Sequence, residues 1–209
     1  MAVEVVFCLL SLAVAIWMRP WRMLHDGALL TPMLGSWAII SWLWALPFLH
    51  HMPLQVSWSG APLITLMLGW PLAVPTLVGL GGMVWALSPA EFDEALALVV
   101  WKGLMPASLT VLLGAALRRW VSHHVFVYVL GRGFLGSVLC IFISSLMAQA
   151  MGNTLPHTTP GLSAVAYWLM AWGDAFITGM LCAIFVAFKP QWLATWSDAL
   201  YLRDEQKSA

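Results

Sequence analysis

Long apolar runs separated by short polar stretches make up almost the whole chain. The runs cover residues 2–18, 28–48, 61–87, 95–117, 125–150 and 162–188. A hydrophobic stretch of about 20 residues is long enough to cross the roughly 30 Å hydrocarbon core of a bilayer as a helix. The pattern therefore predicts an all-α integral membrane protein with no room for a separate soluble domain.

One of these runs, from Ala61 to Leu87, is interrupted by Gly69-Trp70-Pro71 and again by Pro75. Proline inside a helix removes a backbone hydrogen bond and clashes with the preceding turn, so one straight helix is not expected here. We expect two short helices that meet near Gly69, either of which can be re-entrant or strongly tilted. The fold then has about seven transmembrane or re-entrant helical segments.

The basic residues predict the orientation of these segments, because Lys and Arg collect in cytoplasmic loops. They follow the first run, the run from Ala95 and the last run, at Arg19, Arg22, Arg118, Arg119 and Lys189. A single crossing by 61–87 would separate the first cluster from the second, whereas two passes place all of them inside. We therefore expect the N-terminus and the loops at 49–60, 88–94 and 151–161 outside, and the C-terminus inside.

The predicted domain organisation is a single polytopic membrane domain over residues 1–190, followed at 191–209 by an amphipathic interfacial helix and a short polar cytoplasmic tail. Trp192, Trp196, Ala199 and Leu200 share one face at helical spacing, which suits a helix lying on the inner membrane surface. The alternative is a last membrane helix that simply frays.

Composition supports the membrane assignment and excludes other classes. The chain is 62% hydrophobic and 9% charged, with a mean hydropathy of +0.88, which excludes a water-soluble globule. A net charge of zero gives no basic field, so nucleic-acid binding is excluded as a main role. Cys8, Cys140 and Cys182 lie in apolar runs without C-x-x-C spacing and are interpreted as packing residues.

Three charged residues fall within the predicted spans, where charge is costly: Lys102, Arg132 and Asp174. At about 1.5 Å per residue, Asp174 lies about 18 Å below the outer edge and Arg132 about 11 Å above the inner edge of a 30 Å core. These depths nearly coincide, which predicts an Asp174–Arg132 pair with Lys102 as the weaker alternative partner. The network is either a proton or cation path or a buried ion pair that fixes helix register.

The histidines fall into two groups on opposite sides. His50, His51 and His157, with Met52 and Met151 near them, lie in the outer loops, and His25, His123 and His124 lie on the inner side. Imidazoles from separate loops can converge on a transition metal, and a Met thioether favours soft ions such as Cu(I). The outer histidines are therefore the candidate metal ligands, with polar caps on the spans as the alternative.

The remaining motifs do not indicate an enzyme. The stretch from Gly131 to Gly136 matches G-x-G-x-x-G, but it lies inside a span and not between a strand and a helix, so it indicates close helix packing. No serine in a nucleophile motif is paired with an intramembrane histidine, and no two carboxylates share a span. We expect no catalytic residues and no cofactor-binding residues.

Several stretches resemble the energy-coupling factor permeases of the CbiM and NikM type, which capture cobalt or nickel. The stretch 57–71 (SWSGAPLITLMLGWP) resembles their H-L-x-G-A region, and 124–129 (HVFVYV), 172–180 (WGDAFITGM) and 189–195 (KPQWLAT) resemble a divergent branch. The resemblance covers residues 54 to 202. It implies seven helical segments with the amino terminus outside, a cobalt or nickel ion as substrate, a second transmembrane subunit and separate cytoplasmic ATPases. The methionines near the outer histidines add copper to the possible substrates.

The chain departs from that family at its metal ligands. Metal-binding members use the free amino terminus, a histidine in second position and a histidine at the start of the H-L-x-G stretch, where this chain has Ala2 and Ser57. Neither side chain replaces an imidazole. The expected function is a substrate-capture or permease-like subunit of an energy-coupling-factor uptake transporter for a transition-metal ion, in the bacterial cytoplasmic membrane. The alternative is a non-transporting membrane subunit that scaffolds or assembles another complex.

Overall fold

The computed structural model spans residues 1–209 and describes residues 1–25, 27–50, 58–121, 124–153 and 160–197. Helix accounts for 85% of the structure, and the described residues contain no strand. The all-α prediction is confirmed.

The helices follow the predicted apolar runs closely. Their bounds are α1 Ala2–Trp17, η1 Pro20–Leu24, α2 Leu30–Leu49, α3 Ala61–Leu68, α4 Trp70–Leu87, α5 Phe92–Leu98, η2 Val99–Leu104, α6 Met105–Trp120, η3 Val127–Leu135, α7 Gly136–Ala150, α8 Pro160–Phe188 and η4 Pro190–Trp192. The π-helix η2 joins α5 to α6, and the π-helix η3 runs directly into α7. When helices that follow one another without a break are counted as one, the described chain has seven helical segments, the number that the sequence predicts.

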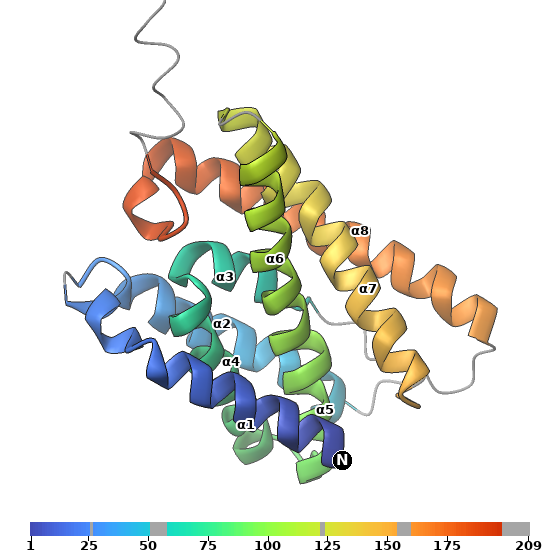
Figure 1. Cartoon of the computed structure of the whole chain (residues 1–209). Coiled ribbons are helices and arrows are strands. Elements are labelled where there is room, and N and C mark those ends of the chain that lie inside the picture. The colour runs from blue at the N-terminus through green and yellow to red at the C-terminus, as the bar shows by residue number, and fades with distance from the viewer. Residues whose placement is uncertain (26, 51–57, 122–123, 154–159, 198–209) are drawn as a thin grey trace, which may run out of the picture.

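Five of these helical segments are long and apolar enough to cross a membrane: Leu30–Leu49, Trp70–Leu87, Phe92–Trp120, Val127–Ala150 and Gly161–Phe188. Helix α1 is apolar and 16 residues long. The architecture is that of a multi-pass membrane protein. Figure 1 shows α1, α2 and α4 on one side of α6 and α7 on the other, while α8 crosses behind α7 and α6. Helix α8 packs along α7, and α3 contacts α2, α4, α6 and α8.

Helix α3 is a short element enclosed by the others. All eight of its residues are buried. At about 1.5 Å per residue it is about 12 Å long, less than half of a hydrocarbon core. Gly60 and Gly69 bound it with φ angles of 65° and 72°, in the left-handed region that glycine adopts without steric cost. The predicted break at Gly69 is confirmed, and its two products are unequal: a half-helix, α3, and an 18-residue helix, α4.

The contacts at the two ends of the bundle agree with a segment 50–87 that runs from one end to the other and back. Asn153 lies beside Glu4 at one end. At the other end, a Cβ placed on Gly69 would lie 3.2 Å from the Met23 side chain and 3.9 Å from Ala194. The segments that the sequence places on one side of the membrane are therefore grouped together.

Small residues let the helices approach closely around η3, as the G-x-G-x-x-G stretch predicts. A Cβ on Gly133 would lie 3.1 Å from the Sγ of Cys182, and a Cβ on Gly179 would lie 3.0 Å from the Cβ of Phe134. The three cysteines are buried and carry free thiols. Their interpretation as packing residues agrees with these positions.

The predicted amphipathic helix at 191–209 is wrong over its described part. Residues 190–192 form a single 3-10 turn, and no α-helix follows through residue 197. The reason is a competing demand on the backbone, because the amides of Ala194 and Thr195 donate to carbonyls of α3. Residues 198–209 of the prediction lie outside the described part of the chain.

Candidate functional site

The carboxylate of Asp174 lies at the amino-terminal end of α3. Asp174 belongs to α8 and is 7% exposed. Its Oδ2 accepts a hydrogen bond of 2.8 Å from the backbone amide of Ser59, and the amide of Gly60 also interacts with it. The first amides of a helix lack intrahelical partners and form the positive end of its dipole. Asp174, on a different helix, therefore holds the two residues that lead into α3, and the Ser59 hydroxyl accepts a hydrogen bond from the first amide of α3, that of Ala61.

The chain before α3 is held in place by the π-helix η2. The hydroxyl of Ser59 donates to the carbonyl of Lys102 at 2.5 Å, and the hydroxyl of Ser144 donates to the carbonyl of Trp101. A π-helical turn spaces its carbonyls differently from an α-helix and is frequent at functional sites. Here two successive carbonyls of the wide turn accept hydroxyls from other segments, which fixes Ser59 beneath Asp174.

Lys102 is the charged residue that acts on Asp174. The two side chains interact electrostatically inside the bundle. A carboxylate and two backbone amides therefore meet at the end of a half-helix, and the charge of Lys102 acts on this carboxylate from η2. Within the described residues, the second carboxylate oxygen of Asp174 and the hydroxyl of Thr178, one turn further along α8, have no hydrogen-bond partner. The carboxylate can bind a proton, or compensate the charge of a cation, in a region of low dielectric.

The sequence predicts Arg132 as the partner of Asp174, and the contacts described for Arg132 are with other residues. It is 4% exposed and lies over the ring of Tyr128, 5.2 Å from its centroid, and against Gly114. Its charge acts on Cys182, two turns beyond Asp174 on α8. The charge that acts on Asp174 is that of Lys102, the alternative partner in the sequence-based prediction.

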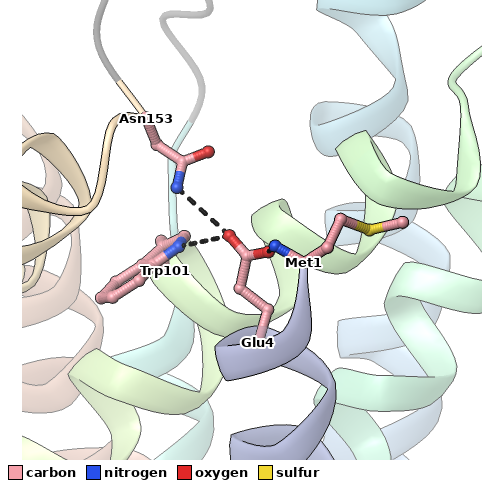
Figure 2. A network of polar contacts seen from close by, with 4 residues as sticks. All are labelled: Met1, Glu4, Trp101 and Asn153. Atoms are coloured by element: carbon pink, nitrogen blue, oxygen red, sulfur yellow. Dashed lines mark hydrogen bonds and ion pairs between the residues drawn. The ribbon is translucent and has the colours of Figure 1, made fainter.

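A second polar cluster closes the end of the bundle where α1 begins. Glu4 is 7% exposed, and its Oε1 accepts hydrogen bonds from Trp101 Nε1 at 3.0 Å and from Asn153 Nδ2 at 3.2 Å. Its Oε2 lies 2.6 Å from the amino group of Met1 (Figure 2). One buried carboxylate thus joins α1, η2 and Asn153, three positions beyond the end of α7.

The sequence did not identify this cluster. A carboxylate in the first turn of an apolar run was visible, but its partners lie 97 and 149 positions away. A tryptophan in a membrane span is counted as apolar from the sequence, because the sequence does not show which acceptor its N–H meets. The backbone amide of Ser59 was missed for a related reason, since a main-chain donor leaves no mark in the sequence.

The candidate metal ligands are only partly described. His50 is exposed at the end of α2, where a ring nitrogen lies 3.2 Å from the carbonyl of Leu46. His51 and His157 lie outside the described residues. Among the residues that are described, no group of three or more His, Cys, Asp or Glu side chains could hold a metal ion. The outer-histidine site therefore remains a prediction.

The fold and the site define the class of this protein. It is a multi-pass, all-α membrane protein with a buried half-helix whose amino-terminal end meets an intramembrane carboxylate. No family model, no curated protein and no solved structure matches the chain.

Proposed function

We propose that the chain is the membrane substrate-capture or permease-like subunit of an energy-coupling-factor uptake transporter. The observation that carries the proposal is the Asp174 carboxylate at the end of α3. Transporters commonly build their sites from discontinuous helices whose ends meet inside the membrane. Ionisable residues within spans are costly and mark transport paths when they are not purely structural.

The charge of the site favours a cation as the substrate. Asp174 and Glu4 are the buried acidic side chains in the described part of the chain, and both lie inside the bundle or at one end of it. A buried carboxylate repels anions and attracts cations in a low-dielectric region. Together with the resemblance to cobalt and nickel permeases, this supports a transition-metal ion such as Co, Ni or Cu.

The transporter needs partners that this chain does not encode. The sequence has no Walker motif, so ATP hydrolysis belongs to separate cytoplasmic ATPases that act with a second transmembrane subunit. Such an assembly operates in the bacterial cytoplasmic membrane, with the C-terminal tail on the ATPase side.

A scaffold without transport is the second candidate. It is favoured by the same carboxylate, since Lys102 and the amides of Ser59 and Gly60 already satisfy much of its charge. A satisfied ion pair can serve helix register alone. In that case the chain would assemble with another membrane complex and bind no ion.

Two measurements on protein purified from native membranes distinguish the candidates. The transporter predicts ATPase subunits in the purified complex and saturable binding of Ni²⁺, Co²⁺ or Cu(I) in equilibrium dialysis. An enzyme complex without ATPase subunits, together with no saturable binding of these three ions, would overturn it and support the scaffold. Arg132→Gln is the matched control for Asp174→Asn in the dialysis, since both remove one buried charge from the bundle.

A further inference from the structure

Helix α3 is held at both ends by segments that lie far away in the sequence. At its carboxyl end, the amide of Ala194 donates to the Met67 carbonyl at 2.8 Å. The hydroxyl of Thr195 donates to the Leu66 carbonyl at 2.8 Å, and the Thr195 amide donates to the same oxygen at 3.3 Å. The last carbonyls of a helix lack intrahelical partners, and these bonds supply them. We call residues 193–196 the carboxyl-terminal clasp.

The clasp is itself fastened to η3. The hydroxyls of Tyr128 and Thr195 are 2.7 Å apart. Because Thr195 uses its only hydroxyl hydrogen on Leu66, Tyr128 is the donor of this bond. The ring of Trp196 meets the ring of Tyr128 edge to face at 4.9 Å, and Leu193 is buried in the main core. Figure 1 shows this red segment of the chain beside α3.

The polar bonds that tie α3 to distant segments are therefore found at its ends. Along its length α3 is buried among apolar side chains, and Thr65 donates to Ala61 within the helix itself. Apolar contact is non-directional, whereas hydrogen bonds fix position. Gly60 and Gly69, both at positive φ, are backbone joints at the two ends. An eight-residue helix between two such joints moves as one body if either end is released.

We propose that α3 is a coupling rod between the intramembrane carboxylate and the carboxyl-terminal clasp. Releasing the clasp loosens the hold of Asp174 on Ser59 and Gly60, and neutralising Asp174 loosens the clasp. The coupling is reciprocal, as thermodynamic linkage requires of two sites that act on one element. A partner that engages the tail then changes the environment of Asp174 about 12 Å away. The proposal goes beyond the transport function, because it holds whichever ion the chain binds.

Hydrogen–deuterium exchange on the purified full chain in lipid nanodiscs tests the proposal. Thr195→Val removes the clasp hydroxyl and keeps the shape of the side chain. We expect the backbone amides of residues 194 and 195 to exchange about fivefold faster, as for the loss of one ordinary hydrogen bond. The decisive amides are those of Ser59 and Gly60, at the far end of α3, which should also exchange at least about twofold faster if the opening is shared.

Asp174→Asn provides the reverse test, since the amide keeps the size of the carboxylate but loses its charge. We expect faster exchange at Ala194 and Thr195, with no substitution near them. Thr76→Val is the matched control. Its hydroxyl is buried and donates to Leu72 within α4, so its removal should leave both ends of α3 unchanged.

Tyr128→Phe covers the case in which Thr195→Val does not fold. It removes the hydroxyl that fastens Thr195 and leaves the ring beneath Arg132. Faster exchange at Ser59 and Gly60 in either clasp variant, together with the reverse effect of Asp174→Asn, supports the rod. Changes confined to the substituted end in each variant would overturn it.

Discussion

Asp174 and Ser59 lie 115 positions apart in the sequence and are joined by a 2.8 Å hydrogen bond from the Ser59 amide to the Asp174 carboxylate. The bond places an acidic side chain of α8 at the positive end of α3 inside the bundle. Helix ends buried in a membrane need partners from the protein, because lipid supplies none. The carboxylate thus has a structural task at the same place where it can take part in transport.

The first prediction concerns the pairing of this carboxylate. Asp174→Asn and Lys102→Met should each destabilise the protein, by on the order of 3 to 5 kcal/mol for a broken buried pair, and the double variant should lose much less than the sum. The reason is that each single variant leaves one charge uncompensated in the bundle. Thermal unfolding in detergent of the four proteins of the cycle gives the coupling energy.

Arg132→Gln is the control for that cycle. Arg132 is buried like Asp174, but its charge acts on Cys182, and its guanidinium group lies over the ring of Tyr128. Its effect should therefore add to that of Asp174→Asn within about 0.5 kcal/mol. The opposite result would be that the stability losses of Asp174→Asn and Lys102→Met add, while those of Asp174→Asn and Arg132→Gln do not. It would show that Asp174 pairs with Arg132, as the sequence predicts, and not with Lys102.

The sequence predicted the helices well because their length and apolarity follow directly from the bilayer. Runs of about 20 apolar residues can fold there only as helices, and the stretch Gly69-Trp70-Pro71 marks the break between α3 and α4. Pro75, which the sequence also suggests as a break, lies inside α4. The sequence did not show that α3 is so much shorter than α4. That difference depends on where Gly60 begins the helix, and a glycine preceded by polar residues reads equally well as part of a loop.

The site was predictable in its residues but not in its pairing. Asp174, Lys102 and Arg132 stand out because charge is rare in spans, yet their partners depend on π-helical turns and on backbone donors. The carboxyl-terminal segment shows the same limit. Trp192 and Trp196 have helical spacing, but the buried carbonyls of α3 need donors, and the backbone of the segment supplies them.

The second prediction concerns the cluster around Glu4. Trp101→Phe removes the N–H that donates to the carboxylate and should cost about 1.5 to 3 kcal/mol, the usual range for a hydrogen bond to a charged group. Thermal unfolding measures the loss. Trp17→Phe is the control, since Trp17 is 82% exposed and the same change there should cost little. Equal losses in the two variants would show that ring size alone, and not the bond to Glu4, sets the stability.

The third prediction uses two neighbouring glycines of α4. A Cβ on Gly81 would lie 1.9 Å from Cγ2 of Val99, whereas a Cβ on Gly82 meets nothing within 4 Å. Val99 is β-branched and stiff, so Gly81→Ala should force α4 and η2 apart at a cost of about 1 to 3 kcal/mol. Gly82→Ala should be neutral or stabilise by up to about 1 kcal/mol, through helix propensity. Equal unfolding temperatures for the two variants would contradict the packing of α4 against η2.

The last prediction concerns orientation. The positions of the basic residues predict that η1, the end of α6 and the end of α8 lie in the cytoplasm. The structure groups Met23, Gly69 and Ala194 at one end of the bundle. Fusions of a periplasm-active and a cytoplasm-active reporter should therefore place residues 90 and 152 outside and residues 27, 121 and 189 inside. Cytoplasmic signals at both 90 and 121 would mean that α3 and α4 do not return the chain to the outer side.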